Sequence, residues 1–312
     1  MNIIGPDELV FGVDDVDTCR TYLSDYGLKE VELGGGGYRF EALDGTALTV
    51  WPKNDPNLPP ALATATTLRQ TVWGCVDQAT VDEIAVELGR DRPVERRPDG
   101  SITTTDDAGF QIAFQVTARR AVDLIAEKVN SPGATPGRTA NEIGADEAAE
   151  ALPRTLSHVV YFTPDALGME AFYVERLKFR VIDRFTNVGP FLQPRASDDH
   201  HCLFFLHTPA HMQGLEHVAF HMQGPTALML AGSRMVKKGY ESFWGPGRHK
   251  FGSNWFWYFN SPMGVHLEYD ADMDKHDDSW VARELEVGPE TSQMFLFESV
   301  EKWSPGGPPA RH

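Results

Sequence analysis

The sequence predicts an α+β fold in which four βαβββ modules pair into two domains. Short runs rich in β-branched and aromatic residues, each followed by a segment of helical period, open four times along the chain. Two pairs of segments also repeat, because 22–31 is similar to 172–181 and 106–113 is similar to 261–268. Because one unit repeats four times along the chain, we predict two domains of two modules each.

The first two modules are predicted within residues 1–120, which form the N-terminal domain. The first module is predicted to contain a strand, a helix and three further strands, at 8–13, 16–26, 28–33, 38–43 and 47–51. The second is predicted to contain a strand, a helix and a closing strand, at 68–75, 79–88 and 110–116.

The other two modules are predicted within residues 153–275, which form the C-terminal domain. The third module is predicted to contain a strand at 156–162, a helix at 168–176 and strands that continue to about 206. The fourth is predicted to contain a strand, a helix and two closing strands, at 215–221, 225–238, 255–260 and 265–269. Residues 121–152, rich in Ala, Gly, Pro and charge, are predicted as a connector, and 276–312 as a C-terminal tail.

The composition narrows the class of protein. A net charge of -17 argues against a nucleic-acid partner, because binding phosphates requires Lys and Arg. No apolar run is long enough to cross a bilayer, and residues 1–8 lack the pattern of a signal peptide. The three cysteines, Cys19, Cys75 and Cys202, are too scattered for a disulfide framework. We expect a soluble cytoplasmic enzyme that acts on a small molecule and assembles as a homo-oligomer.

All 11 histidines lie in the second half of the chain, and the first is His158. His158, His217 and Glu268 each interrupt a short apolar run that reads as a strand. Two imidazoles and one carboxylate form the facial triad that holds non-heme Fe(II) and leaves positions open for substrate and O2. This set favours a metal-dependent ring-cleaving dioxygenase.

The internal repeat provides a control for the metal ligands. When the second module is aligned on the fourth, Gln70 stands in the place of His217 and Ala113 in the place of Glu268. The N-terminal half therefore has the scaffold without the ligands, and we expect it to have a structural role.

These residues resemble the type I extradiol dioxygenases of the vicinal oxygen chelate superfamily, and the two-domain dihydroxybiphenyl dioxygenases in particular. In that family a first His opens the third module, a second opens the fourth, and a Glu ends the fourth, as His158, His217 and Glu268 do here. The resemblance covers nearly the whole chain and is concentrated between residues 158 and 269.

The resemblance implies three further active-site residues. His201 is the second member of a His-His pair that is similar to the family's acid–base histidine. His249 follows Gly-Arg, as the family's substrate-contacting histidine does, and Tyr258 stands ten residues before Glu268. The implied metal is Fe(II), with Mn(II) as the alternative, and O2 is the co-substrate.

Strand alternation suggests which side chains line the substrate pocket. His266 shares a strand face with Glu268, so it is expected either to support a metal ligand or to line the pocket. Phe256 shares a strand face with Tyr258. With Phe191 added, these side chains favour a neutral catechol that is apolar, aryl-substituted or bicyclic. A carboxylated catechol would require an arginine that the sequence does not place.

The remaining histidines are expected to be structural or superficial: His200, hydrogen-bonded and facing away from His201, and also His207, His211, His221, His276 and His312. The acidic stretch 270–274 is expected to be a solvated loop, with calcium as the alternative. Two other functions fit the same fold: a glyoxalase-like isomerase or lyase, and a binding protein repurposed from an enzyme. The first usually adds a fourth protein ligand, and the second lacks the triad.

Overall fold

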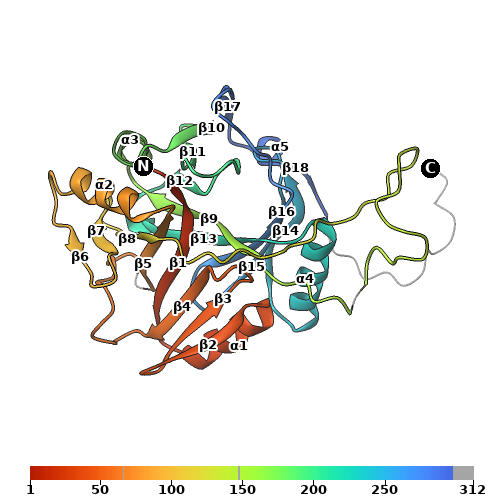
Figure 1. The fold of residues 1–312 in the computed structure, drawn as a ribbon, viewed down its shortest axis with the longest axis horizontal. Helices are drawn as coiled ribbons and strands as arrows, with labels where there is room; N and C mark the ends of the chain where they lie inside the picture. The colour runs from red at the N-terminus through yellow and green to blue at the C-terminus, as the bar shows by residue number, and fades with distance from the viewer. Residues whose placement is uncertain (66, 147, 298–312) are drawn as a thin grey trace.

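The computed structural model describes residues 1–65, 67–146 and 148–297, and it shows the four predicted βαβββ modules in the predicted order (Figure 1). The elements of the first module are β1 (Ile3–Val13), α1 (Val16–Tyr26), β2 (Lys29–Gly34), β3 (Gly37–Glu41) and β4 (Ala47–Pro52). Those of the second are β5 (Leu68–Cys75), α2 (Gln78–Leu88), β6 (Glu95–Arg96), β7 (Ile102–Thr105) and β8 (Gln111–Val116). The α+β prediction is confirmed.

The second half of the chain repeats this order. The third module contains β9 (Thr155–Thr163), α3 (Ala166–Ala171) with its π-helical extension η1 (Phe172–Arg176), β10 (Arg180–Thr186), β11 (Gly189–Gln193) and β12 (Leu203–His207). A short 3-10 turn, η2 (Ala210–Met212), leads to the fourth module. That module contains β13 (Gly214–His221), α4 (Pro225–Lys237), β14 (Ser242–His249), β15 (Trp255–Asn260) and β16 (His266–Ala271).

Each half of the chain forms one sheet in which two modules meet through their first strands. Within the described residues the N-terminal order is β2-β3-β4-β1-β5-β8-β7-β6. The C-terminal order is β17-β10-β11-β12-β9-β13-β16-β15-β14-β18, where β17 is Arg283–Glu286 and β18 is Gln293–Leu296. The central pairs β1/β5 and β9/β13 are antiparallel, whereas β5/β8 and β13/β16 are parallel. The first strand of each module therefore lies at the middle of its sheet.

The first three α-helices begin at a repeated signal. Asp15, Asp77 and Asp165 each precede a helix and accept a hydrogen bond from the backbone N–H three residues further on. Such a cap satisfies one of the free N–H groups of the first turn. Helix α1 ends at Gly27, whose φ of 104° suits a residue without a side chain.

The predicted C-terminal tail differs from the structure. Residues 276–297 contribute β17 (Arg283–Glu286), α5 (Pro289–Ser292) and β18 (Gln293–Leu296). Strand β17 pairs with β10 at one edge of the C-terminal sheet, and β18 pairs with β14 at the other. Because these pairings join residues far apart in the sequence, local patterning does not reveal them. The rest of the predicted tail, 298–312, lies outside the described residues.

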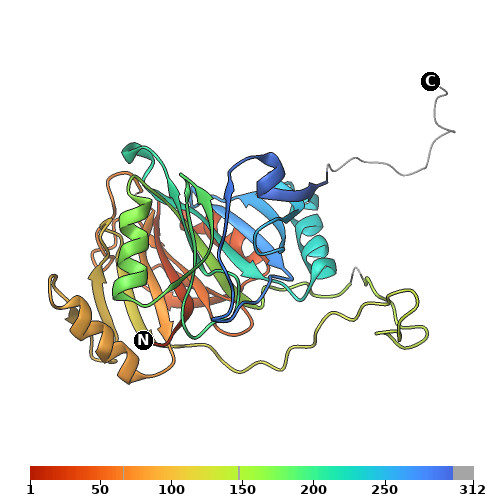
Figure 2. The ribbon, with the colours of Figure 1, turned by 90° about the horizontal axis from the view of Figure 1, so that it is seen from above.

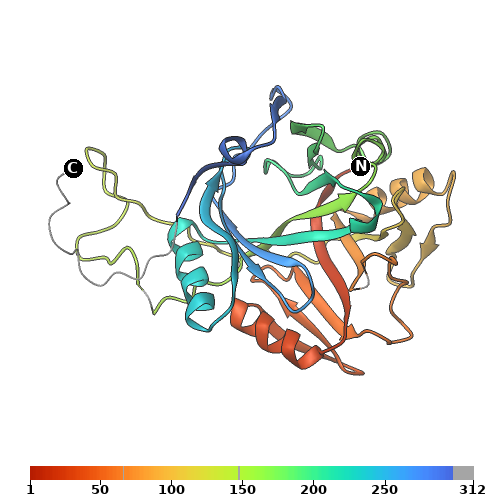
Figure 3. The same cartoon turned by 180° about the vertical axis from the view of Figure 1, so that it is seen from behind.

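The segment between the halves has no helix or strand among its described residues, and it extends away from the sheets beyond α4 (Figures 2 and 3). Both ends are attached to the body: Arg120 forms an ion pair with Glu41, and the carbonyl oxygen of Ala151 accepts hydrogen bonds from the Arg234 guanidinium. We propose that the N-terminal domain ends at residue 120 and the C-terminal domain begins at residue 153.

The two halves share one hydrophobic core, to which Trp73 of β5 and Tyr173 of the third module both contribute, with ring centroids 5.9 Å apart. A second, smaller core contains Val160, Phe185, Phe191, Phe204 and Phe251 and lies within the C-terminal half. Across the described part of the chain, no helix is both long and apolar enough to span a bilayer.

Candidate active site

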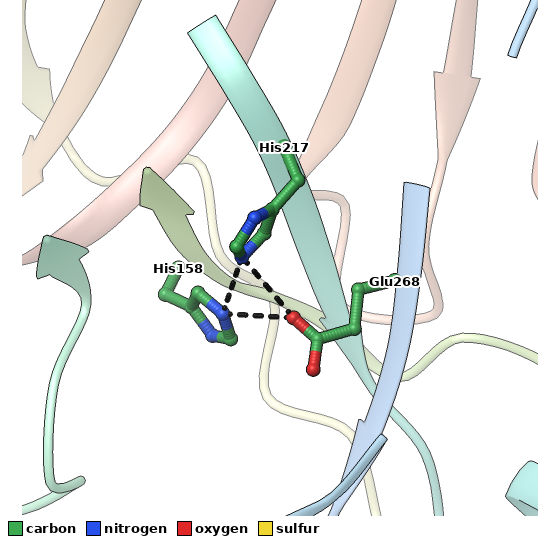
Figure 4. Close-up of side chains that lie close together, drawn as sticks. All are labelled: His158, His217 and Glu268. Carbon is green, nitrogen blue, oxygen red and sulfur yellow. Dashed lines mark hydrogen bonds and ion pairs between the residues drawn. The ribbon is translucent and has the colours of Figure 1, made fainter. Parts of the chain in front are cut away.

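The three predicted ligands meet at one point of the C-terminal sheet (Figure 4). His158, His217 and Glu268 come from β9, β13 and β16, which are consecutive neighbours in that sheet. The Nε2 atoms of the two histidines lie 3.2 Å apart, and Oε2 of Glu268 lies 3.0 Å from His158 Nε2 and 3.3 Å from His217 Nε2. All three side chains are buried.

A β-bulge in β13 places Glu216 beside the ligand that follows it. Leu215 pairs with Tyr161 and His217 with Val160, so Glu216 is the extra residue on its strand. One carboxylate oxygen of Glu216 contacts Nδ1 of His217, and the other accepts a hydrogen bond from Nδ1 of His266 at 2.7 Å. The bulge thus directs two consecutive polar side chains to the same region.

A second bulge has the same effect in β9, where Ser157 and His158 together lie opposite Ala219 of β13. Ser157 Oγ lies 2.9 Å from Nδ1 of His158 and donates a hydrogen bond to Oδ2 of Asp270 at 2.8 Å. The chain of contacts therefore runs from a ligand histidine through a hydroxyl to a buried carboxylate. Such contacts orient a metal-ligating imidazole and raise its basicity.

These contacts fix where the ring hydrogens lie. A carboxylate accepts only, and Ser157 already donates to Asp270, so Nδ1 is the protonated atom of both neutral ligand rings. Their Nε2 lone pairs then point toward one another and toward Glu268. Among the described residues, neither carboxylate oxygen of Glu268 receives a hydrogen bond. With both rings neutral the buried Glu268 carboxylate would be unpaired, which is costly, so either protons on the two Nε2 atoms or a metal ion must balance its charge.

The separations between the three atoms fit a transition-metal ion. Three ligands at right angles, each about 2.1 Å from one ion, lie about 3.0 Å apart. The observed separations are 3.0, 3.2 and 3.3 Å. The three side chains are therefore spaced as a group that could hold one metal ion.

The electrostatics of this site also favour a cation. Burial alone would lower the pKa of His217, but the Glu216 and Glu268 carboxylates raise that pKa to about 10. Burial opposes ionisation of Glu268 as well, yet His158 and His217 hold the pKa of Glu268 well below its usual range. A metal ion would replace protons here, so binding would release them.

Two members of the triad, His158 and His217, line a cavity of about 670 Å³. Aromatic and aliphatic side chains make up most of the lining, including Phe185, Phe191, Phe204, Phe251 and Trp244. The rings of Phe191 and Phe204 stack in parallel, with centroids 4.0 Å apart. The lining contains no Arg or Lys among the residues that the structure describes.

The three predicted catalytic residues also line this cavity. The ring of His201 is 4.4 Å from that of His158, and the ring of Tyr258 is 5.0 Å from that of His217. His249 donates from Nδ1 to the carbonyl oxygen of Ser292 at 2.9 Å, and its Nε2 lies 3.1 Å from the Tyr258 hydroxyl. Burial, together with Glu268, raises the pKa of Tyr258 well above 10, so the hydroxyl keeps its proton and can donate a hydrogen bond.

Two of the three predicted lining residues lie elsewhere. Phe191 lines the cavity, whereas Phe256 lies behind His249, with its ring centroid 4.0 Å from that of His249. His266 stacks on Phe243 at 3.7 Å and hydrogen-bonds Glu216 instead of facing the substrate. Both lie on the expected strand face, but His249 covers Phe256 and Phe243 covers His266, and it is these two that line the cavity. The contact of His266 with Glu216 fits the alternative expectation that His266 supports a ligand.

Two other sequence interpretations were wrong. His200 does not face away from His201, because both precede β12 and their Nδ1 atoms are 2.9 Å apart. Asp270 is not in a solvated loop: it is fully buried in β16 and pairs with His221 as well as contacting Ser157. His207 and His211 are exposed, as expected, and His312 lies outside the described residues.

Several polar residues of the site were not predicted: Ser157, Asp183, Glu216 and Asp270. The signal that identifies two of them is a polar residue directly before a candidate ligand within an apolar run, as in Ser157-His158 and Glu216-His217.

The N-terminal half repeats the same frame with other residues. Asp7 and Arg69 are the extra residues of bulges in β1 and β5, at the places of Ser157 and Glu216. Glu8 therefore corresponds to His158, as Gln70 corresponds to His217 and Ala113 to Glu268. Glu8 is held by Arg39 and Thr49. These residues do not form a second triad.

Comparison with known proteins agrees with this geometry. Residues 155–269 match the model of the Glyoxalase/Bleomycin resistance protein/Dioxygenase superfamily, a range that begins with β9 and includes the three ligands. Over 139 residues the chain is 36% identical to metapyrocatechase 2 of Cupriavidus necator, and this alignment covers 45% of the chain but only 43% of that relative.

Solved structures resemble this segment and the rest of the chain together. The Mn(II)-bound glyoxalase of Novosphingobium aromaticivorans has a TM-score of 0.75 and 21% identity, covering 94% of this chain and 91% of the other. The 2,2',3-trihydroxybiphenyl 1,2-dioxygenase of Sphingomonas wittichii has a TM-score of 0.71 and 16% identity, covering 95% and 99%. At these identities the likeness shows the fold.

Proposed function

We propose that the protein is an extradiol catechol dioxygenase, an oxidoreductase that inserts both atoms of O2 into a catecholic ring. The observation that carries this proposal is the convergence of His158, His217 and Glu268 at an apolar cavity that His201 and Tyr258 also line. The similarity to metapyrocatechase 2 supports it. The proposed metal is Fe(II), with Mn(II) as the alternative.

In this proposal each residue has a separate task. His158, His217 and Glu268 would hold the metal, which when bound brings catechol and O2 together and passes electron density between them. His201 takes a proton from a catechol hydroxyl and later returns it, because imidazole exchanges protons near neutral pH. The Tyr258 hydroxyl and His249 position the substrate oxygens by hydrogen bonding. The apolar lining limits the entry of water.

The cavity favours a neutral substrate that is larger than catechol itself. Its volume of about 670 Å³ exceeds the needs of one ring, and the stacked pair Phe191 and Phe204 offers an aromatic surface. Because no Arg or Lys of the described residues lines it, a carboxylate would be buried without a partner. We propose 3-substituted catechols with an aryl or second fused ring.

The test is anaerobic reconstitution with Fe(II), followed by O2 and a panel of catechols. We expect a yellow ring-fission product from cleavage beside the hydroxyl pair, and a higher kcat/KM for aryl catechols than for protocatechuate and homoprotocatechuate. Protein reconstituted with Mn(II) and metal-free protein are measured in parallel to identify the metal. A muconic acid product, or a preference for the carboxylated catechols, would contradict the proposal.

The competing function is that of a metal-dependent isomerase or lyase of the glyoxalase kind. Such an enzyme usually adds a fourth protein ligand, whereas the metal-ligand cluster of the described residues has three members. Ala113 of the N-terminal half stands at the position that corresponds to Glu268, so that half supplies no additional Glu there. The same reconstituted protein is therefore assayed for isomerisation of a hemithioacetal. Turnover there without oxygen consumption would favour the isomerase.

We also propose a cytoplasmic homo-oligomer. Cys19, Cys75 and Cys202 are free and buried, as is usual in a reducing compartment. Met294, Phe295 and Leu296 of β18 are exposed apolar side chains at a sheet edge, where a second copy could cover them. Light scattering of the purified protein would test the assembly, and a monomeric mass would reject it.

A further inference from the structure

A chain of hydrogen bonds leads from the cavity into the protein behind His201. Nδ1 of His201 lies 2.9 Å from Nδ1 of His200, and Nε2 of His200 lies 2.8 Å from Oδ2 of Asp183. His200 and Asp183 are fully buried, and His201 is 5% exposed. None of these contacts involves a metal ligand.

The partners of each atom determine where the hydrogens lie. The Asp183 carboxylate can only accept, so Nε2 of His200 carries a hydrogen. Burial lowers the pKa of His200 more than Asp183 raises it, so His200 is neutral and its Nδ1 has a lone pair. Because one of two facing nitrogens must donate, Nδ1 of His201 carries the hydrogen. The lone pair of neutral His201 is then on Nε2.

Arg283 fixes the far end of this chain. Its backbone N–H donates to Oδ1 of Asp183 at 2.8 Å, and its guanidinium donates to both carboxylate oxygens. Burial would raise the pKa of Asp183, yet the hydrogen bonds from His200 and Arg283 lower it to about 2. A carboxylate held in this way is a weak base, so it orients His200 without taking its proton.

We propose that Asp183 and His200 are positioning residues that fix His201 as the tautomer with a hydrogen on Nδ1 and a lone pair on Nε2. The ring of His201 lines the cavity, and Nδ1 is engaged by His200, so Nε2 is the nitrogen available to the substrate. His201 is thereby set as a proton acceptor before any substrate binds. That its proton comes from a catechol hydroxyl rests on the proposed function.

The proton balance of this step is simple. The substrate hydroxyl gives its proton to Nε2 of His201, leaving one negative charge on the substrate oxygen and one positive charge on the ring. Nδ1 keeps its hydrogen throughout and continues to donate to His200. Asp183 and His200 therefore neither gain nor lose a proton, and their contribution is to hold a single tautomer in place.

The tautomer can be measured without turnover. In protein labelled with ¹⁵N in the histidine rings, two-bond ¹H–¹⁵N correlation spectra distinguish protonated from bare ring nitrogens. The spectra are recorded on the metal-free protein and on the Zn(II)-loaded protein, and the His201 signals are assigned by their loss in His201→Phe. We expect a protonated Nδ1 and a bare Nε2 for His201, and the reverse for His200. A protonated Nε2 on neutral His201 would overturn the proposal.

Two substitutions at one position separate the hydrogen bond from packing. His200→Asn keeps an amide oxygen near the position of Nδ1, whereas His200→Phe keeps the ring and removes the acceptor. We expect the Phe variant to show both His201 tautomers and a fall in kcat on the order of 10²-fold, with KM little changed. The Asn variant should recover most of the single tautomer and of kcat. Equal loss in both variants would indicate a packing role only.

A third substitution keeps the test decisive if His200→Phe does not fold. In Asp183→Asn, the new amide can donate to Nε2 of His200 as well as accept from it. The ring hydrogen of His200 is then no longer held on Nε2, and we expect both tautomers of His201. A single unchanged tautomer in this variant would overturn the proposal. The spectra do not depend on catalysis, so the two proposals can fail separately. If His201 shows the expected tautomer but the protein cleaves no catechol, the proposed function is rejected and the positioning role of Asp183 and His200 is retained.

Discussion

Ser157 occupies the same position relative to His158 as Glu216 does relative to His217. Each is brought alongside its ligand by a β-bulge, and each places a side-chain oxygen on Nδ1 of the histidine that follows. The two contacts differ in charge, because Glu216 presents a carboxylate directly and Ser157 presents a hydroxyl backed by Asp270. The two histidines therefore differ in how strongly their outer nitrogen is held.

This difference predicts unequal effects on metal affinity. In Glu216→Gln the charged acceptor of His217 is lost, and we expect Zn(II) or Fe(II) affinity to fall about 10- to 100-fold. In Ser157→Ala, Asp270 remains 3.4 Å from Nδ1 of His158, so we expect a smaller loss. Competition titration with a chelating dye measures both. Equal affinity in Glu216→Gln and the parent protein would show that the carboxylate does not act through His217.

Removal of the carboxylate ligand should abolish metal binding. Glu268→Ala leaves His158 and His217 with no negative partner of the triad, and we expect loss of most bound metal. The matched control is Glu8→Gln, which removes a carboxylate from the corresponding frame of the N-terminal half. Metal content is measured by elemental analysis after gel filtration. Full occupancy in Glu268→Ala would reject the assignment of the site.

The acid–base role of His201 predicts loss of turnover with retention of metal. His201→Phe should bind metal as the parent does and lose about 10²-fold or more in kcat, because only the proton acceptor is removed. His207→Phe alters an exposed histidine at the end of β12, the strand that follows His201, and should change neither property. Steady-state oxygen uptake with the preferred catechol provides the measurement, and an unchanged rate in His201→Phe would exclude the role.

His221 predicts a pH dependence of stability on the alkaline side. Burial would lower its pKa, but Asp270 and Asp199 raise it to about 10. A folded-state pKa above the unfolded value of about 6.5 means that the charged histidine stabilises the fold fully below pH 6.5. That contribution is lost as the pH rises through 10.

Thermal unfolding of the metal-free protein between pH 6.5 and 10.5 tests this dependence. We expect the Tm of the parent to fall across this range more steeply than the Tm of His221→Gln. His207→Gln, at an exposed site, should follow the parent. Parallel curves for the parent and His221→Gln would show that the ion pairs of His221 do not contribute.

Arg234 joins the two halves of the molecule, and its loss should destabilise both. Its guanidinium donates to the carbonyl oxygens of Asp25, Tyr26 and Ala151 at 3.1 to 3.2 Å. Arg234→Ala leaves these acceptors unpaired, and we expect a loss of about 2 kcal/mol in the free energy of unfolding. The control is Lys237→Ala, an exposed residue on the same helix. Urea denaturation would contradict the expectation if both variants unfolded at the same midpoint.

Hydrophobic period was sufficient to predict the modules, because each is a local unit with one helix between strands. The ligands were predictable for a related reason: a polar residue inside an apolar strand is unusual, and His158, His217 and Glu268 are three such residues. Order along the chain then placed them in neighbouring strands of one sheet.

The residues around the ligands were less predictable, because they depend on departures from regular strands. Strict alternation places Glu216 on the opposite face from His217, and only the bulge brings the two together. The same rule placed Phe256 in the cavity, where the structure has it behind His249. Arg283 could not be assigned to the site at all, because its contact with Asp183 joins residues 100 positions apart.

The repeated bulges of β1 and β5 make the N-terminal half a ready frame for protein engineering. Its strands reproduce the pairing that surrounds the triad, with Glu8, Gln70 and Ala113 at the three ligand positions. Introducing histidine at positions 8 and 70 and glutamate at position 113 would give both halves the same ligand set. Arg39, which pairs with Glu8, would also be replaced so that it does not occupy the new site. The difference in affinity between the two sites would then measure what the neighbours of the ligands add to a backbone that both halves share.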